Sequence, residues 1–223
     1  MVRVGIIDSG GAKWDLQGSA AFDPQGQITD ARPDMLGHGT AVASVISQGC
    51  PGASLVHAQV MTDRAVTSAL RVAAALSWLT NLGGERRVDV VCMSFGLAAD
   101  RELLRLSINE AFEAGIILIA SSPARRLPEV SCYPADYECV IAATGDARCD
   151  WGGVSVLSPK LFGTWSNSPE QGGQGAAGAS IAAARLAGLV AELMFKSSGP
   201  LSYPDIVRTL VRKASFHGAE VKR

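Results

Sequence analysis

The strongest constraint on how this chain folds is a repeated alternation between short apolar runs and longer segments of helical periodicity. Five runs are nearly continuous in apolar residues, at 2–7, 53–61, 88–93, 116–120 and 139–143. Such runs are typical of parallel strands that are covered on both faces. Helices are predicted between them at 66–82 and 101–114, and Gly115 is placed to end the second. Because strand, helix and strand recur, the pattern predicts a three-layer α/β fold, with a central, mostly parallel sheet and helices on both faces.

The remaining segments complete a single domain over residues 1–223. With 48% hydrophobic residues, a chain of this length can bury one substantial core but would be cramped as two domains. A short sixth strand is predicted at 154–157 and a last helix at 204–213. In contrast, the polar residues 11–36 are interpreted as an irregular surface loop, and the tail after Phe216 as frayed.

Charge and hydropathy exclude several classes of partner. The formal net charge is −1, which gives no electrostatic reason to expect nucleic acid as a ligand. No run reaches the ~18 apolar residues of a membrane span, so no membrane partner is expected. The chain begins with a strand pattern and lacks the apolar core of a signal peptide. We therefore expect a cytoplasmic protein.

The five cysteines form no CxxC pair and show no regular metal-binding spacing. Reduced thiols, mostly buried, are one interpretation. A disulfide between Cys132 and Cys139 across a short loop is the other for that pair, and spacing alone does not decide between them. No cluster of Asp and Asn is typical of a calcium loop, so neither a metal nor any other cofactor is expected.

Three polar residues stand at glycine-flanked turns where predicted elements end or begin. Asp8 ends the first strand, His38 lies in the first turn of a helix, and Ser180 opens a long helix of small residues after a glycine-rich loop. These residue types match the orienting carboxylate, the base and the nucleophile of acyl transfer, because a hydroxyl needs an imidazole to take its proton and the imidazole needs a carboxylate to fix its tautomer. The alternative for Ser180 is the N-cap of a core helix, a position that serine favours. His57, inside a predicted strand, is expected to be structural.

The motifs around these residues resemble those of the subtilisin-like serine proteases. Ile6-Ile-Asp-Ser-Gly10 resembles the aspartate motif of that family, Gly37-His-Gly-Thr-Ala-Val-Ala43 its histidine motif, and Gly178-Ala-Ser-Ile-Ala182 its serine motif. The order Asp, His, Ser along the chain is also the order in subtilisin. The resemblance runs through nearly the whole chain and implies a subtilisin-like fold with Asp8, His38 and Ser180 as the catalytic triad.

The resemblance also implies a substrate-binding groove. The segment Met93-Ser-Phe-Gly96 is similar to the family's strand that pairs with the substrate backbone, and the segment 132–142 is similar to the one leading out of the specificity pocket. By this likeness two short segments form the walls of the groove: Ser94, Phe95 and Gly96 on one side, and Ile119, Ala120 and Ser121 on the other.

One departure from the family concerns the oxyanion hole. Family members carry an asparagine after the strand at 116–120, and its side chain donates one of two hydrogen bonds to the oxyanion. This chain reads Ala-Ser-Ser-Pro there, which places Pro123, a residue without a donor, at that position. The backbone N–H of Ser180 would supply one donor, and the hydroxyls of Ser121 and Ser122 are candidates for the other.

Together these features predict a serine endopeptidase that cleaves a peptide or protein substrate through an acyl-enzyme. A dedicated role, such as removing the leader from a ribosomally made peptide, fits a short member of the family. Two alternatives stay open because of the missing asparagine. The chain could be an impaired pseudoprotease that binds a peptide or partner protein without turnover, or a subunit whose site is completed by a partner chain.

Overall fold

The computed structural model describes residues 1–13, 18–123 and 130–220. Its strands are β1 (Val2–Asp8), β2 (Ala20–Phe22), β3 (Ile28–Asp30), β4 (Ala53–Gln59), β5 (Val90–Met93), β6 (Ile117–Ser121), β7 (Val140–Gly145), β8 (Val154–Ser158), β9 (Leu161–Thr164) and β10 (Phe216–His217). Its α-helices are α1 (His38–Gly49), α2 (Ala69–Thr80), α3 (Glu102–Glu113), α4 (Ala179–Lys196) and α5 (Tyr203–Lys213). Among the fully described elements, the short 3₁₀ helices η2 (Gly84–Arg86) and η3 (Pro169–Gln171) lie in connections.

The described strands form one sheet in the order β10-β8-β9-β7-β6-β5-β1-β4-β2-β3. Its central strands, from β7 through β6, β5 and β1 to β4, are all parallel to their neighbours. Antiparallel pairs occur toward the margins, where β2 meets β3 and β8 meets β9. The mostly parallel α/β sheet predicted from the alternation of strands and helices is thus confirmed.

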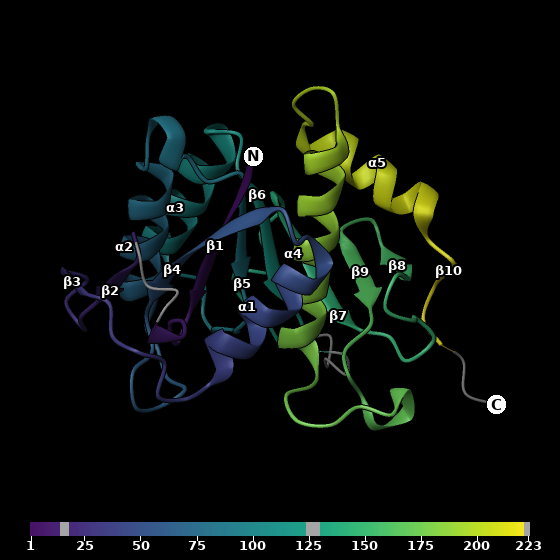
Figure 1. Cartoon of the computed structure of the whole chain (residues 1–223), viewed down its shortest axis with the longest axis horizontal. Helices are drawn as coiled ribbons and strands as arrows, with labels where there is room; N and C mark the ends of the chain where they lie inside the picture. The colour runs from purple at the N-terminus through teal and green to yellow at the C-terminus, as the bar shows by residue number, and fades with distance from the viewer. Residues whose placement is uncertain (14–17, 124–129, 221–223) are drawn as a thin grey trace.

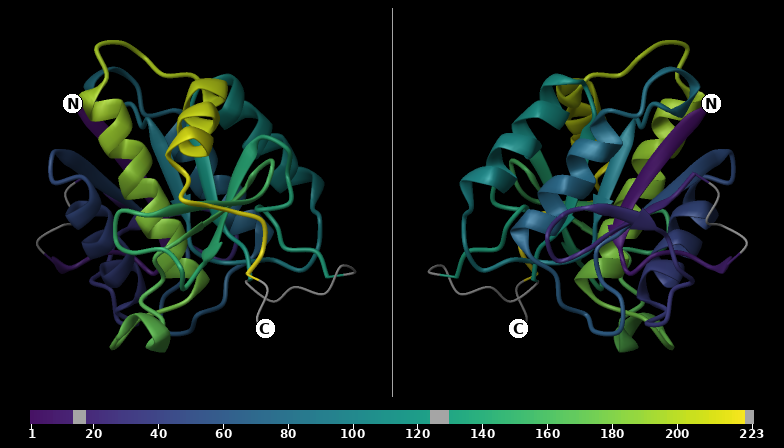
Figure 2. Two further views of the ribbon diagram at one scale, coloured as in Figure 1. Left: turned by 90° about the vertical axis from the view of Figure 1, so that its right-hand side faces the viewer. Right: turned by 90° about the vertical axis from the view of Figure 1, so that its left-hand side faces the viewer.

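The side chains of successive residues in the central strands point to opposite faces of the sheet. Ile6 belongs to a core shared with α1, α4 and α5, whereas Ile7 belongs to a core shared with α2 and α3. Because side chains alternate along a strand, a continuously apolar strand such as β1 supplies both cores at once. The helices therefore cover the sheet on both sides and complete the three layers (Figures 1 and 2).

Local signals set several of the helix ends. The Ser68 side chain accepts a hydrogen bond from the backbone N–H of Arg71 at the start of α2. Ser202 and Asp205 form a capping box at the start of α5. Gly115 follows α3 with a φ of 80°, a left-handed conformation that favours glycine, as its predicted place at the end of that helix requires.

The margins of the sheet differ from the sequence-based expectation. The segment 11–36, expected to be an irregular loop, contains the β2–β3 hairpin, and the Phe22 ring packs against Trp78 with ring centroids 5.9 Å apart. The tail after Phe216 was expected to be frayed, but its first residue, His217, pairs with β8 as part of β10, and its residues 221–223 lie outside the described residues. Strands of two or three residues are too short to show a hydrophobic period, so their pairing depends on the neighbouring strand.

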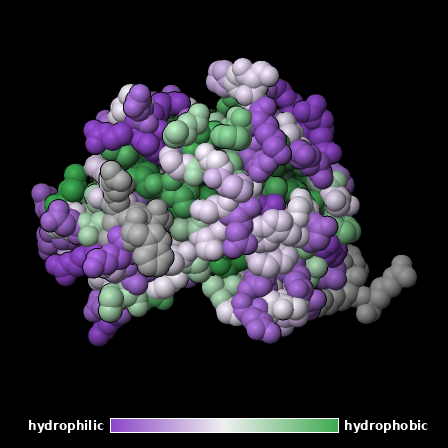
Figure 3. Space-filling model, in the orientation of Figure 1, coloured by the Kyte–Doolittle hydropathy of each residue, from purple (hydrophilic) through white to green (hydrophobic). Residues whose placement is uncertain are grey.

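Within the described ranges, none of the helices combines the length and apolar character needed to cross a bilayer. On the face shown in Figure 3, hydrophilic residues alternate with small apolar areas.

Candidate active site

The candidate site lies where the parallel strands end. Asp8 is the last residue of β1, and Ser94 directly follows β5. His38 and Ser180 lie in the first turns of α1 and α4, two helices that pack on the same face of the sheet (Figure 1). Sites in open α/β sheets form at this carboxyl edge, because the loops that follow the strands meet there.

Asp8 and His38 form a direct pair. The Nδ1 atom of His38 lies 2.7 Å from Oδ1 of Asp8, and the Asp8 carboxylate is fully buried. The same Oδ1 accepts a hydrogen bond from the backbone N–H of Ser9 at 2.7 Å. Oδ2 has no hydrogen-bond partner among the residues that the structure describes. The carboxylate therefore acts on the imidazole through one oxygen and is otherwise shielded from solvent.

This pairing changes the protonation of the imidazole. The hydrogen bond to Asp8 raises the pKa of His38 above its ordinary value of 6.5, while partial burial works in the opposite direction. The negative charges of Asp8 and of Asp34 raise the pKa further, because they stabilise the protonated ring. A base that holds its proton well once charged suits the transfer of a hydroxyl proton.

Close packing of two glycines explains the local sequence around His38. A Cβ atom on Gly39 would lie 2.2 Å from the carbonyl oxygen of Gly10, so only glycine lets α1 approach the turn after β1. The Gly39 N–H donates to the Ser9 hydroxyl at 2.9 Å. The turn after Asp8 and the first turn of α1 are thus in direct contact, which holds His38 beside Asp8.

Asp34 is a polar residue near the site that was not among the predicted site residues. Its carboxylate accepts hydrogen bonds from the backbone N–H groups of Leu36, Gly37 and Thr40, and from the Thr40 hydroxyl. Burial by itself raises the pKa of Asp34, but the hydrogen bonds from Thr40, Ser9 and Gly37 hold it below its ordinary value. The sequence signal for Asp34 is an acidic residue shortly before a helix whose N-cap is a glycine, because such a helix needs an acceptor from elsewhere.

Ser180 is not the N-cap of its helix. The N-cap is Gly178, and α4 begins at Ala179, so Ser180 is the second helical residue. Its backbone N–H lies in the first turn, where helical N–H groups have no acceptor within the helix. The N-cap alternative is therefore wrong, and the N–H of Ser180 is placed at a helix end that favours negative charge.

The hydroxyl of Ser180 contacts Ser94. Its Oγ donates to the carbonyl oxygen of Ser94 at 2.8 Å, and the Ser94 hydroxyl donates to the carbonyl oxygen of Ser180 at 3.3 Å. In the described part of the chain no hydrogen bond joins Ser180 to His38. The structure thus brings together Asp8 with His38, and Ser180 with Ser94, at one edge of the sheet.

The two predicted walls of the substrate groove differ in accessibility. Ser94 and Phe95 follow β5, and Gly96 is exposed. In contrast, Ile119 and Ala120 are fully buried, and β6 is paired with β5 on one side and β7 on the other. Contact of a substrate with these two residues, as the resemblance implied, stays a prediction. Only Ser121 of this wall stands at the strand end.

The oxyanion candidates near β6 are largely engaged elsewhere. The Ser121 hydroxyl donates to the carbonyl oxygen of Phe95 at 3.2 Å, and the backbone N–H of Ser122 donates to the carbonyl of Ala143 at 2.7 Å. Ser121, Ser122 and Ser180 stay predicted oxyanion donors, and of the Ser121 and Ser180 groups the Ser121 hydroxyl would have to rotate away from Phe95 first. Pro123 is exposed, and the predicted loop that continues from it includes residues 124–129, which lie outside the described residues.

A cavity lies against the start of α4. Its volume is about 510 Å³, and its lining includes Gly178 and Ala179, which directly precede Ser180. Thr144 and Asp146, at and beyond the end of β7, line another side. Neither Ser180 nor His38 is among its described lining residues.

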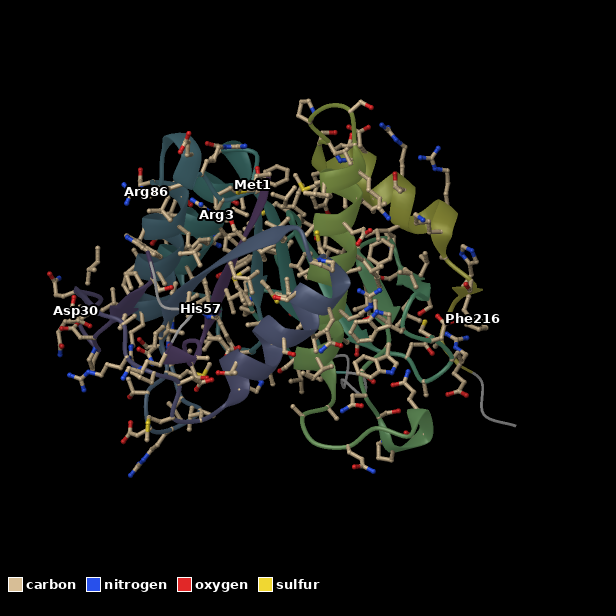
Figure 4. The ribbon with its side chains drawn as sticks, viewed as in Figure 1. Met1, Arg3, Asp30, His57, Arg86 and Phe216 are labelled. Atoms are coloured by element: carbon tan, nitrogen blue, oxygen red, sulfur yellow. The ribbon has the colours of Figure 1, made fainter. Side chains whose placement is uncertain are left out.

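Across residues 1–13, 18–123 and 130–220, no group of three or more His, Cys, Asp or Glu side chains is placed to hold a metal ion. Cys132 and Cys139 are not joined, since the Cys132 thiol donates to the carbonyl of Ser121 and the Cys139 thiol to the side chain of Asn109. His57 lies in β4 and is fully buried (Figure 4).

One class of α/β proteins places an Asp, a His and a Ser where strands end and helices begin. The fold of this chain and the residues at the carboxyl edge of its sheet define the same class. The sequence profile of the Subtilase family matches residues 2–222. The chain therefore belongs to the subtilase family, as the three motifs predicted.

Individual relatives are more distant. Subtilisin DY from Bacillus licheniformis is 26% identical, and the match covers 95% of this chain and 81% of that protein. The minor extracellular protease Epr from Bacillus subtilis (strain 168) is also 26% identical, but the match covers 64% of this chain and only 23% of that longer protein. Among solved structures, the nisin leader peptidase NisP from Lactococcus lactis has a TM-score of 0.69 at 18% identity, covering 95% of this chain and 81% of that chain.

Proposed function

We propose that this protein is a serine endopeptidase that cleaves peptide bonds through an acyl-enzyme formed on Ser180. The observation that carries the proposal is the 2.7 Å contact between a buried Asp8 and His38 at the same sheet edge as Ser180. Membership in the subtilase family and the protease names of its relatives support it.

The proposed reaction uses each residue for one task. The Ser180 hydroxyl leaves the Ser94 carbonyl by rotation about its side-chain bond and attacks the substrate carbonyl. His38 takes the hydroxyl proton and then delivers it to the leaving amine, while Asp8 holds the imidazole and stabilises its charged form. The first-turn N–H of Ser180 donates to the oxyanion. Water, activated by His38, then releases the acyl group and restores the hydroxyl.

Labelling with a fluorophosphonate tests this chemistry directly. We expect one adduct per chain, located on Ser180 by peptide mass spectrometry and lost in Ser180→Ala. Hydrolysis of an extended fluorogenic peptide by the wild type, lost in the same variant, is expected alongside. A folded wild-type protein that forms no adduct at pH 8 would contradict the proposal.

A peptide-binding pseudoprotease is the second candidate. The observation that favours it is the engagement of the Ser121 hydroxyl by Phe95 and of the Ser122 N–H by Ala143, which leaves few donors for the oxyanion. Tight peptide binding without turnover would support this candidate. Activity that appears only on mixing with another protein would instead support a subunit completed by a partner chain.

For the substrate, we propose a peptide precursor from which a leader is removed. The support is a shared fold with a protein named as the nisin leader peptidase. The test is to compare a leader-bearing precursor peptide with casein as substrates. Cleavage of the precursor at one site, with casein left intact, is the expected result. Equal and unselective cleavage of both would indicate a general protease.

We also propose that the protein acts in the cytoplasm. Its cysteines are unlinked in the structure, and Cys50, Cys92 and Cys149 are buried, which suits a reducing compartment. Epr, in contrast, is named as extracellular. Fractionation of the source cells with an antibody to the protein tests this proposal, and recovery from the culture medium would overturn it.

A further inference from the structure

The start of α1 lacks the capping group that a helix normally has. Its N-cap is Gly37, which has no side chain, and its first turn carries no acidic residue. The backbone N–H groups there need acceptors from elsewhere, because a helix cannot satisfy its own first turn. His38 is the first residue of this helix, so whatever satisfies this turn also controls the position of its ring.

Asp34 supplies these acceptors with both of its oxygens. Oδ1 accepts from the N–H groups of Leu36 at 3.0 Å and Gly37 at 2.9 Å. Oδ2 accepts from the N–H of Thr40 at 2.9 Å and from the Thr40 hydroxyl at 2.8 Å. These contacts hold the chain on both sides of His38.

Asp34 is itself anchored to the turn that follows Asp8. Its backbone N–H donates to the carbonyl oxygen of Gly11 at 3.0 Å. The Ser9 hydroxyl, in the same turn, accepts from the N–H of Gly39. One continuous network therefore connects the turn after β1 to the first turn of α1.

We propose that Asp34 is a positioning residue for His38, which fixes the imidazole between Asp8 and Ser180 and adds a second negative charge near the ring. This inference rests on the proposed function, in which His38 is the base. Asp34 does not touch the reacting atoms but acts through the first turn of α1.

The negative charge of Asp34 changes the pKa of His38 in one direction only. The charged groups that raise the pKa of His38 are Asp8 from β1 and Asp34 from the loop before α1. The facing end of α4 brings Ser180, which is uncharged, and β5 leads to Ser94, also uncharged. Removing the Asp34 charge therefore lowers the pKa of His38.

The test uses three variants. Asp34→Asn keeps the side-chain shape but removes the charge and replaces one acceptor oxygen by an amide donor facing Thr40. Thr40→Val removes one hydrogen bond to Asp34 without changing any charge. Asp30→Asn is the matched control, since Asp30 is an exposed carboxylate at the outer edge of β3 (Figure 4).

The first readout is independent of activity. The sequence holds three histidines, His38, His57 and His217, so an NMR titration of the imidazole Cε1–H signals is readily assigned with a His38→Gln variant. We expect the His38 midpoint to move to lower pH in Asp34→Asn, and to stay in place in Thr40→Val and Asp30→Asn. An unchanged midpoint in a folded Asp34→Asn would overturn the electrostatic part.

The second readout is turnover of an extended peptide, counted per active site by fluorophosphonate titration. We expect kcat to fall about tenfold or more in Asp34→Asn, because small displacements of a catalytic group are costly, and to fall less in Thr40→Val. The KM should change little. Unchanged kcat in Asp34→Asn, or in Thr40→Val if Asp34→Asn does not fold, would overturn the positioning role. A wild type without adduct or turnover would instead refute the proposed function, and the NMR result would still stand.

Discussion

The hydroxyl of Ser180 donates to the main-chain carbonyl of Ser94 at 2.8 Å, while the hydroxyl of Ser94 donates to the main-chain carbonyl of Ser180. This reciprocal pair joins the end of β5 to the start of α4. It also means that the Ser180 hydroxyl must turn away from Ser94 before its proton can pass to His38. Such rotation between staggered positions is a small step for a serine side chain.

The rate of fluorophosphonate labelling is expected to rise with pH. Only a neutral imidazole can take the Ser180 proton, and the hydrogen bond to Asp8 raises the pKa of His38 above 6.5. The rising limb of the pH profile should therefore lie above pH 6.5, with slow labelling at more acidic pH. Second-order rate constants measured from pH 5 to 9 check this, and a rate that does not depend on pH would rule out His38 as the base.

Asp8→Asn is expected to lower turnover about 10⁴-fold, by analogy with removal of the charge of the orienting carboxylate in other serine proteases. The amide favours the wrong imidazole tautomer and no longer stabilises the charged ring. The pKa of His38 should fall as well, because Asp8 is the main cause of its rise. Steady-state kinetics together with the NMR titration provide the measurement. A loss of less than tenfold in a folded variant would argue against this role for Asp8.

Gly49→Ala is expected to destabilise the protein by about 1–3 kcal/mol. A Cβ atom at Gly49 would lie 2.6 Å from Nη1 of Arg185 and 3.0 Å from the Cα atom of Gly188, and Arg185 is buried against Trp151. The added methyl group would push α1 away from α4, the two helices that carry His38 and Ser180, so kcat should also fall. Urea unfolding and peptide kinetics measure the two effects.

The control for this change is Gly199→Ala, where a Cβ atom would meet nothing within 4 Å. Its free energy of unfolding should stay within about 0.5 kcal/mol of the wild type. Equal stability of Gly49→Ala and Gly199→Ala would show that the helices can adjust their spacing without cost.

Lys160→Met is expected to lower the free energy of unfolding by about 1–3 kcal/mol, because it leaves carbonyl groups without their donor. The Lys160 ammonium donates to the main-chain carbonyls of Asp136 and Tyr137 at 2.7 Å each, and to that of Ala135 at 3.4 Å. Urea unfolding checks this, with Lys213→Met, a change at an exposed lysine of α5, as the control. No difference between the two variants would mean that solvent replaces the ammonium freely.

The order and type of the central elements were predictable because their signals are local. Continuous apolar runs identify strands that are covered on both faces, and caps or glycines mark helix ends. Asp8, His38 and Ser180 could be selected for the same reason, since each stands at a glycine-flanked turn where an element begins or ends. The physical cause of each signal lies within a few residues of it.

Other features depend on residues that are distant in the sequence. Phe22 is buried because Trp78 lies opposite it, and β10 exists because β8 offers a free edge. The Ser121 hydroxyl donates to the Phe95 carbonyl, a partner that its position in the sequence does not predict. A hydroxyl donates one proton, so the nearest suitable acceptor decides its role.

The sequence by itself therefore determined the α/β class, the family and the three residues with the chemistry for acyl transfer. Only the tertiary structure decided which polar groups meet: Asp8 with His38, Ser180 with Ser94, and Asp34 with the first turn of α1. The reason is physical. Apolar periodicity indicates which face of a segment is buried, and it is visible within the segment itself. A hydrogen bond instead requires two particular atoms within about 3 Å, and that distance is set by the folded backbone.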